Sequence, residues 1–138
     1  MNILIAENDP DYRNVLADLL ETNGHRVFKA ADGQNAYRLL HYFDIDMIIS
    51  DIAMPVLSGD QFHDKIRKDP CFQWIPFIYI SGYPQLRAAV KIENHELDFC
   101  LSKLGPIQEF TDIVREIVGR LKKEETNQPG ATHGAHAA

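Results

Sequence analysis

The sequence lacks the features that mark secreted, membrane-spanning and disulfide-bonded proteins. Its two cysteines, Cys71 and Cys100, form neither a CxxC pair nor a regularly spaced framework. It has no charged and apolar N-terminal leader, and no apolar run of about 18 residues that could cross a membrane. We therefore expect free thiols in a reducing compartment, a cytoplasmic location and no association with membranes.

Positive charge and nucleotide-binding motifs are also missing. Lysine and arginine number 14 against 20 aspartates and glutamates, and the resulting net charge of −6 argues against nucleic-acid binding by this domain alone. There is no GxGxxG motif, no P-loop and no internal repeat. What is present is the composition of a single globular domain, with 45% hydrophobic and 25% charged residues in a chain of 138.

Hydrophobic periodicity divides the chain into alternating strands and helices. Five short apolar runs have the pattern of buried strands: 2–6, 25–30, 47–50, 75–80 and 99–102. Helical stripes of apolar residues follow them, at 12–20, 36–43, 62–66, 84–97 and 106–121. Because such an alternation produces a parallel sheet covered on both faces, we predict a flavodoxin-like α/β protein, doubly wound, with a five-stranded parallel sheet in the order 2-1-3-4-5 and five helices.

Local signals set the limits of the first helix and of the folded part. Asp9 and Pro10 suit the cap and the first position of the first helix, and Gly24 follows its end. We expect residues 1–121 to form one domain and the polar residues 122–138 to form a disordered tail. Nothing after residue 121 resembles an output domain, so the chain either signals by docking or is part of a longer protein.

Polar side chains stand directly after four of the predicted strands. They are Glu7, Asn8 and Asp9 after the first strand, Asp51 after the third, Ser81 after the fourth and Lys103 after the fifth. Because the carboxyl ends of parallel strands meet at one edge of a sheet, we expect these side chains to lie close together. Carboxylate and amide oxygens suit Mg²⁺, whereas an ammonium and a hydroxyl suit phosphoryl oxygens. A carboxylate in such a site can act as the nucleophile that forms an aspartyl phosphate.

Four segments of the chain resemble the response-regulator receiver domain of two-component signalling. They are NILIAENDPDYRNVL at 2–16, DIAMPVLSG at 51–59, ISGYP at 80–84 and LSK at 101–103, and the likeness extends over about residues 1–121. DIAMPVLSG matches the phosphoacceptor segment of the family at each characteristic position, which are Asp51, Met54, Pro55 and Gly59.

The resemblance implies a role for each residue at the strand ends. Asp51 is the implied phosphorylation site, Lys103 pairs with the phosphoryl oxygens and Ser81 supplies the switch hydroxyl. The implied cofactor is Mg²⁺, with Glu7, Asn8, Asp51 and the main-chain carbonyl of Ala53 as its ligands. The implied phosphodonor is a sensor histidine kinase or a histidine phosphotransfer protein. Self-phosphorylation and self-dephosphorylation are the only reactions expected of the chain, which is therefore a switch and not an enzyme.

The acidic pair of the family is incomplete in this chain. Asn8 stands where the family usually has an aspartate that touches the metal directly. An amide oxygen still ligates a metal but brings no charge, so the affinity for Mg²⁺ should be lower. Asp9, one residue later, could supply the missing charge, although it also suits the cap of the first helix.

Two further departures concern the fifth strand. Cys100 occupies the position where the family usually has the switch aromatic, and Phe99, one residue earlier, should point to the opposite face of the sheet. The Lys-Pro pair of the family is replaced here by Lys103-Leu104. A cis bond at that position would cost about 2.5–4 kcal/mol without proline, so the loop should be built differently.

Three functions remain open at this point. The first is a phosphorylatable switch whose downstream protein docks on the helices at 84–97 and 106–121. The second is a receiver-like interaction module that takes phosphate poorly, for which Asn8 and Cys100 are the evidence. The third is an Mg²⁺-dependent phosphohydrolase, which is disfavoured because Ala53, two residues after the nucleophile, cannot protonate a leaving group.

Other polar residues are expected to have no chemical role. His41, His63 and His95 fall on predicted helices without partners, and we expect them on the surface. Asp44 and Asp46 precede the third strand, at the rim opposite the predicted site, and should form a solvated turn.

Overall fold

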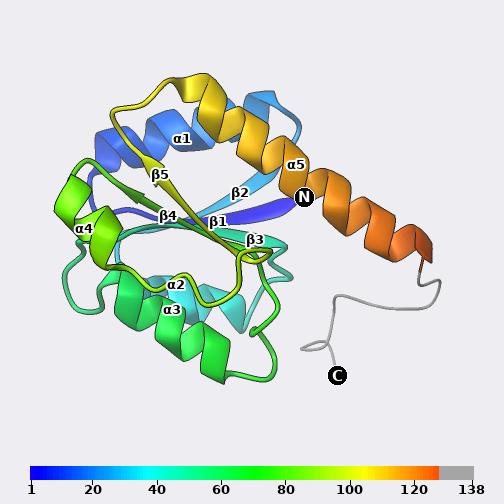
Figure 1. The fold of residues 1–138 in the computed structure, drawn as a ribbon, viewed down its shortest axis with the longest axis horizontal. Coiled ribbons are helices and arrows are strands. Elements are labelled where there is room, and N and C mark those ends of the chain that lie inside the picture. Colours follow the sequence, from blue (N-terminus) through cyan, green and yellow to red (C-terminus); the bar gives the residue numbers. More distant parts are fainter. Residues whose placement is uncertain (128–138) are drawn as a thin grey trace.

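The structure, a computed structural model, describes residues 1–127 and has the predicted alternation of strands and helices (Figure 1). The strands are β1 (Asn2–Ala6), β2 (Arg26–Ala30), β3 (Met47–Asp51), β4 (Phe77–Ser81) and β5 (Asp98–Ser102). The helices are α1 (Pro10–Thr22), α2 (Gly33–Leu40), α3 (Gly59–Lys68), α4 (Pro84–Ala89) and α5 (Ile107–Asn127). The five strands are parallel in the order β2-β1-β3-β4-β5, so the predicted flavodoxin-like fold is confirmed.

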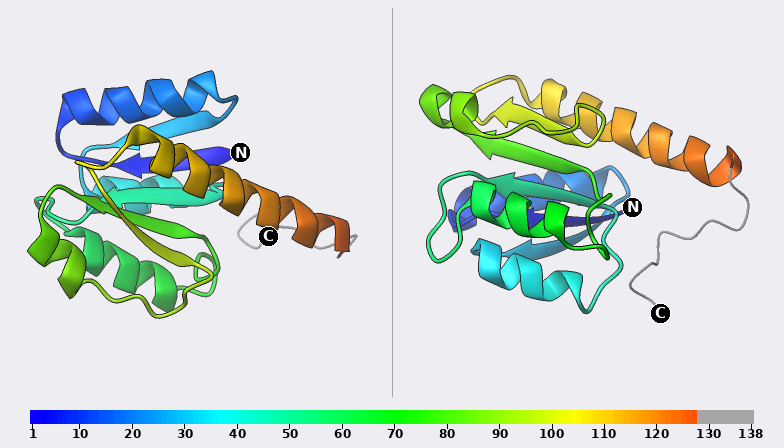
Figure 2. Two further views of the ribbon diagram at one scale, coloured as in Figure 1. Left: turned by 45° about the horizontal axis from the view of Figure 1, so that its top comes forward. Right: turned by 60° about the horizontal axis from the view of Figure 1, so that its bottom comes forward.

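Helices cover both faces of the sheet, with α1 and α5 on one face and α2, α3 and α4 on the other (Figure 1, Figure 2). Successive residues of a strand point to opposite faces, so each central strand contributes to two cores. Ile3 and Ile5 of β1 belong to the core that contains Phe110 of α5, whereas Leu4 belongs to the core that contains Phe62 of α3. Burial on both sides explains why these strands read as continuous apolar runs.

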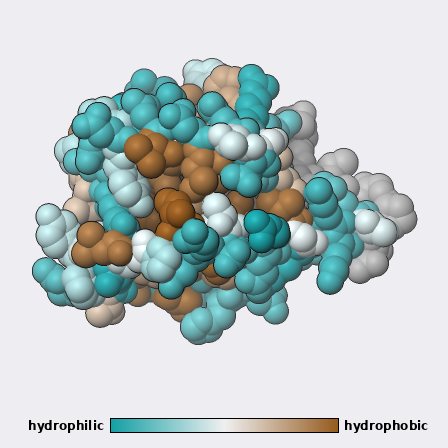
Figure 3. Space-filling model, turned by 90° about the horizontal axis from the view of Figure 1, so that it is seen from above, coloured by the Kyte–Doolittle hydropathy of each residue, from teal (hydrophilic) through white to brown (hydrophobic). Residues whose placement is uncertain are grey.

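The outer surface is less uniform than the interior. Figure 3, which shows the face covered by α1 and α5, has apolar side chains near its middle with hydrophilic ones around them. The exposed large apolar side chains of the helices include Val15 of α1 and Ile107 of α5. None of the helices in residues 1–127 is long and apolar enough to cross a membrane.

The start of α1 follows the predicted capping pattern. The Asp9 carboxylate accepts a hydrogen bond from the backbone N–H of Asp11 at 3.0 Å, and Pro10 occupies the first turn of the helix. After the helix, Gly24 has a φ of +89°, a conformation that costs little without a Cβ. The chain therefore leaves β1 in a fixed direction, and α1 begins beside the carboxyl end of the sheet.

The fourth helix is shorter than predicted, because α4 ends at Ala89 and not at residue 97. Val90 has an extended backbone and packs against the core from an irregular segment. Asp98 holds this segment, since its Oδ2 accepts hydrogen bonds from the backbone N–H groups of Glu93 and Asn94 at 3.1 and 3.2 Å. The apolar residues Val90 and Ile92 are thus partly buried without a helix, and the docking surface expected on a helix at 84–97 needs correction.

The last helix is longer than predicted. α5 runs to Asn127 and passes the expected boundary at residue 121, so the prediction of disorder is wrong for residues 122–127. The charged residues after Leu121 end the apolar stripe, but lysine and glutamate are good helix formers and continue the helix in solvent. The remaining part of the expected tail, residues 128–138, lies outside the described residues.

The predicted surface position of His63 is wrong, because His63 belongs to a buried polar network. Its side chain is 2% exposed, and its Nε2 lies 2.8 Å from Oδ1 of Asp98, whose side chain is fully buried. Arg67 donates to the same oxygen at 2.6 Å and to the carbonyl of Ile75 at 2.8 Å. Packing against aromatic rings of β4, such as Tyr79 at 5.1 Å between centroids, completes the burial of His63. This network joins α3 to the start of β5.

Candidate functional site

The carboxyl ends of β1, β3 and β5 converge on one pocket, as the strand order requires. Its lining consists of residues from the strand ends, the following loops and the first turn of α1: Glu7, Asn8, Asp9, Tyr12, Asp51, Ala53, Gly82, Tyr83, Lys103 and Leu104. Of the predicted site residues, only Ser81 is absent from this lining. It is buried at the end of β4, with Gly82 and Tyr83 of the next turn reaching the pocket in its place.

Lys103 links the two buried carboxylates of the site. Its Nζ lies 2.9 Å from Oε1 of Glu7 and 3.2 Å from Oδ2 of Asp51. Glu7 is fully buried and Asp51 is 6% exposed, so both charges depend on the ammonium for compensation. Residues 7, 51 and 103 are thereby brought together at the ends of three strands, as the sequence predicted.

Electrostatics favour an additional cation beside Glu7. Burial raises the pKa of its carboxyl, and the neighbouring charge of Asp51 raises it further, against the lowering effect of Lys103. Burial alone would lower the pKa of Lys103, but the hydrogen bond to Glu7 and the charge of Asp51 outweigh it, and the net shift is upward. The second carboxylate oxygen of Glu7, Oε2, is buried and has no hydrogen-bond partner. An unpartnered buried oxygen of this kind is suited to a metal ion.

The other oxygen atoms that line the pocket are of the types that bind Mg²⁺. Asn8 and Ala53 are exposed and line the pocket, so an amide oxygen and a main-chain carbonyl could join the carboxylates of Glu7 and Asp51. Within residues 1–127, no three His, Cys, Asp or Glu side chains are grouped to hold a metal by themselves. Asp9 is engaged as the cap of α1, which favours its structural interpretation over a role as a third carboxylate. Mg²⁺ typically uses one or two carboxylates and completes its octahedron with water and phosphate oxygens.

The loop after Asp51 is shaped by Gly59. The backbone N–H of Gly59 donates to the carbonyl of Ile52 at 2.8 Å, which folds the loop back on the end of β3. A Cβ at Gly59 would overlap the carbonyl oxygen of Asp51, so no larger residue fits there. This close approach explains the glycine at the end of DIAMPVLSG.

The turn after β4 connects the pocket to α4. The hydroxyl of Ser81 accepts a hydrogen bond from the backbone N–H of Tyr83 at 3.0 Å. The carbonyl of Ser81 accepts from the backbone N–H of Lys103 at 3.1 Å and from Nη1 of Arg87 at 2.9 Å. Arg87 lies on α4, so one carbonyl group joins this helix to Lys103, the residue that follows β5.

Phe99 and Cys100 of β5 point to opposite faces of the sheet, as predicted. Cys100 packs against the core beneath α2 and α3, whereas Phe99 packs against the core beneath α1 and α5. Cys100 is paired in register with Tyr79 of β4, whose large ring is fully buried. Both cysteines are free thiols. The described residues contain no cis peptide bond, so the loop at Lys103-Leu104 is built from trans bonds.

Three contacts at the site were not predicted from the sequence patterns. Arg13 donates from Nη1 to the carbonyl of Glu7 at 2.6 Å, the ring of Tyr12 lies 4.7 Å from Nζ of Lys103, and Arg87 holds Ser81 as described. Tyr12 was predicted only as part of the apolar stripe of α1. Its place one turn after the acidic segment was the single signal that it lies near the site.

Comparisons with known proteins identify the family of the chain. The family model for the response regulator receiver domain matches residues 3–115. The sensor histidine kinase TmoS of Ectopseudomonas mendocina is 31% identical over 91% of this chain, and the response regulator Rre1 of Synechocystis sp. is 29% identical over 87%. The chain spans 14% of the length of TmoS and 52% of that of Rre1.

One similar solved structure carries a metal. The receiver domain of sensor histidine kinase PA1611 from Pseudomonas aeruginosa, with a magnesium ion coordinated in its active site cleft, is 27% identical to this chain. The similarity covers 86% of this chain and 97% of that one, with a TM-score of 0.76. Receiver sequences of this kind therefore occur alongside sensor histidine kinases and bind Mg²⁺ in their active sites.

Proposed function

The chain belongs to the response regulator receiver domain family of two-component signalling, and from this premise we propose that it accepts a phosphoryl group on Asp51 and thereby switches the binding of a partner. Receiver domains are phosphoacceptor switches and not conventional enzymes. The observation that carries the proposal is the pocket in which Lys103 bridges Glu7 and Asp51 at 2.9 and 3.2 Å.

The chemistry follows from the position of Asp51. One of its carboxylate oxygens attacks the phosphorus of a phosphohistidine donor in line, so that an O–P bond forms while the P–N bond breaks and the imidazole leaves with the electron pair. Lys103 neutralises charge on the phosphoryl oxygens, and the Ser81 hydroxyl donates to one of them once its turn moves inward. Bound Mg²⁺, held by Glu7, Asn8, Asp51 and the carbonyl of Ala53, would supply further positive charge for the same oxygens.

The donor is a sensor histidine kinase or a histidine phosphotransfer protein, and the reaction takes place in the cytoplasm. Support for the donor comes from two similar proteins. TmoS is a sensor histidine kinase, and the PA1611 structure is the receiver domain of a sensor histidine kinase. The experiment is transfer from a phosphotransfer protein that carries labelled phosphohistidine. We expect label to leave the donor and appear on this chain only with Mg²⁺ present. Transfer that proceeds equally with a chelator would argue against the proposed site.

The proposed metal ligands lead to a prediction about Asn8. Asn8→Asp should tighten Mg²⁺ binding on the order of tenfold, because it adds a negative charge to a set that has two carboxylates. Titration calorimetry measures this directly. Asn14→Asp, which adds the same charge on the exposed side of α1, is the control and should leave the affinity unchanged. Equal or weaker binding by Asn8→Asp would mean that another group already supplies the charge.

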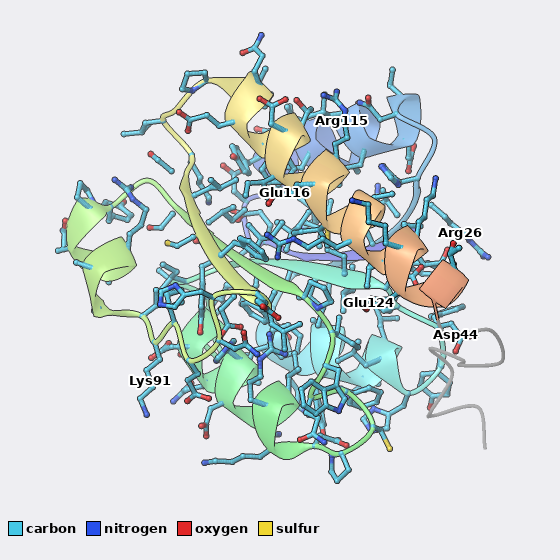
Figure 4. All side chains as sticks on the ribbon, turned by 45° about the vertical axis from the view of Figure 1, so that its right-hand side comes forward. Arg26, Asp44, Lys91, Arg115, Glu116 and Glu124 are labelled. Atoms are coloured by element: carbon cyan, nitrogen blue, oxygen red, sulfur yellow. The ribbon has the colours of Figure 1, made fainter. Side chains whose placement is uncertain are left out.

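The signal is proposed to leave the site through the turn after β4. Phosphorylation adds a charge of roughly −1.5 to −2 at the site. The Ser81 carbonyl accepts a hydrogen bond from Arg87, so an inward movement of this turn pulls on α4, which has no fully buried residue and packs on the core through the partly buried Leu86. Cys100 is too small to take the space that the family fills with an aromatic ring. The partner-docking surface is therefore α4, the irregular segment after it and α5; Figure 4 shows Lys91 of that segment extending away from the body of the protein.

This route predicts a local change in hydrogen exchange. Beryllofluoride, a phosphoryl mimic, should alter the protection of backbone amides in residues 82–97 in the presence of Mg²⁺, while the central strands stay protected. Hydrogen-exchange mass spectrometry measures both regions at once. Arg87→Ala should weaken the change in residues 84–89, since the link to Ser81 is lost. Unchanged protection of residues 82–97, with changes elsewhere, would contradict the route.

A receiver-like interaction module is the second candidate. The exposed amide of Asn8 and the small side chain of Cys100 favour it, because one lowers the charge at the metal site and the other removes the usual switch aromatic. Such a module would bind its partner equally with and without the phosphoryl mimic. The phosphohydrolase candidate has no observation in its favour, since Ala53 still offers no acid group in the pocket.

A further inference from the structure

We propose that Tyr12 is a positioning residue of this site, whose ring holds the Lys103 ammonium over the pocket while Asp51 gains and loses the phosphoryl group. The inference rests on the proposed function of Asp51. It concerns a side chain that lies in the segment 2–16 but to which the resemblance assigns no role.

The ammonium of Lys103 has three partners in the structure. Its Nζ lies 2.9 Å from Glu7, 3.2 Å from Asp51 and 4.7 Å from the centroid of the Tyr12 ring. An ammonium has three N–H donors, and the two carboxylates can take two of them, which leaves a side free for the electron-rich face of the ring. The Lys103 side chain is only 18% exposed, so water competes little for that side.

Of the three partners of Lys103, only the ring is neither modified in the proposed reaction nor shared with the proposed metal ion. The carboxylate of Asp51 loses its negative charge when it becomes an acyl phosphate, and Glu7 is one of the proposed metal ligands. Asp51 therefore no longer holds Lys103 as a carboxylate, and Glu7 shares its charge with the metal, at the moment when the ammonium must meet the phosphoryl oxygens. The ring of Tyr12 carries no charge and does not compete with those oxygens, so it can retain Lys103 throughout the cycle.

The position of the Tyr12 ring is fixed by contacts that do not involve Lys103. Tyr12 lies in the first turn of α1, where its backbone N–H is directed at the capping carboxylate of Asp9 at 3.5 Å. The ring is half-buried and packs against the core that contains Leu16 and Phe110. It also lines the pocket itself. A ring held by a helix cap and a core is preorganised, which is what a positioning residue needs.

The test compares Tyr12→Leu, which removes the ring, with Tyr12→Phe, which keeps it, in the full chain. Tyr42→Leu removes an exposed tyrosine that precedes β3 at the opposite end of the sheet and serves as the control. At saturating Mg²⁺, Tyr12→Leu should raise the Kd for beryllofluoride about fivefold, while the other two variants stay within about twofold of wild type. The Kd for Mg²⁺ alone should not follow this pattern, because Lys103 is not a metal ligand.

Nuclear magnetic resonance gives a second measurement that needs no phosphoryl mimic. The ε-methylene group of Lys103 should lose its ring-current shift and become more mobile in Tyr12→Leu but not in Tyr12→Phe. Unchanged mobility of Lys103 in Tyr12→Leu would overturn the proposal, as would a Tyr12→Phe defect equal to that of Tyr12→Leu. If the wild-type chain binds no beryllofluoride, the proposed function fails, and the mobility of Lys103 still decides the role of Tyr12.

Discussion

Asp51→Asn should abolish the labelling of this protein by acetyl phosphate, seen as the loss of a mass gain of one phosphoryl group. Asparagine has nearly the size of aspartate, and its amide oxygen can still accept a hydrogen bond from Lys103, which lies 3.2 Å from the carboxylate. The fold should therefore persist while the nucleophile is lost, because an amide is a far weaker nucleophile than a carboxylate. Intact-mass spectrometry of the protein with Mg²⁺ and acetyl phosphate measures the effect.

The control for this substitution is Asp18→Asn, an exposed position on α1 outside the pocket. It should label as wild type does, and circular dichroism should find all three proteins folded. An Asp51→Asn variant that gains a phosphoryl group at the wild-type rate would show that the nucleophile is a different residue.

Asp98→Ala should have the largest effect on stability, lowering the free energy of unfolding by about 3–5 kcal/mol. The fully buried Asp98 carboxylate accepts from Arg67 at 2.6 Å and from the backbone of Glu93 and Asn94, and it pairs with His63 at 2.8 Å. Its removal leaves a buried guanidinium and two backbone N–H groups without their acceptor. Urea unfolding at neutral pH measures the loss, and Asp64→Ala, which breaks the exposed pair with Lys68, should change stability little.

The same carboxyl should make stability depend on acid. Burial alone would raise the pKa of Asp98, but the hydrogen bonds from His63 and Arg67 outweigh it and bring the pKa to about 2, from an ordinary value of 3.8. Because the unfolded chain then binds the proton more readily than the folded chain, stability falls as the pH drops from about 4 to 2. This group contributes about 2 kcal/mol above that window, and the contribution is lost below it. The midpoint of urea unfolding should fall between about pH 4 and pH 2 in the wild-type protein, and this fall should be smaller in Asp98→Ala. An equally steep fall in the variant would show that Asp98 is not the responsible group.

Much of the fold could be predicted because its signals are local. Continuous apolar strands and the cap at Asp9 are properties of short segments, and the structure places them as expected. The errors arise where a residue is packed on the core without being helical, or is helical without being buried. Val90 is apolar and packs on the core without being helical, whereas Lys122 is charged and helical without being buried. Periodicity alone cannot distinguish these cases, because it reports burial and not backbone conformation.

The site was predictable to the extent that it lies at strand ends. Glu7, Asp51 and Lys103 had to meet once the strand order was known, and the structure brings them within hydrogen-bonding distance. The role of Tyr12 could not be predicted, since it depends on the direction of one side chain across two elements. The pairing of His63 with Asp98, 35 residues apart, depends in the same way on how α3 packs against β5.

The most direct test of the central claim is a time course of intact mass for the wild-type protein with Mg²⁺ and a small phosphodonor such as acetyl phosphate. We predict a gain of one phosphoryl group that maps to Asp51, requires Mg²⁺ and persists after the donor is removed. A protein that never gains the group would be an interaction module. Continuous release of phosphate without accumulation of the labelled chain would identify a phosphohydrolase, and either result would contradict a phosphoacceptor switch at Asp51.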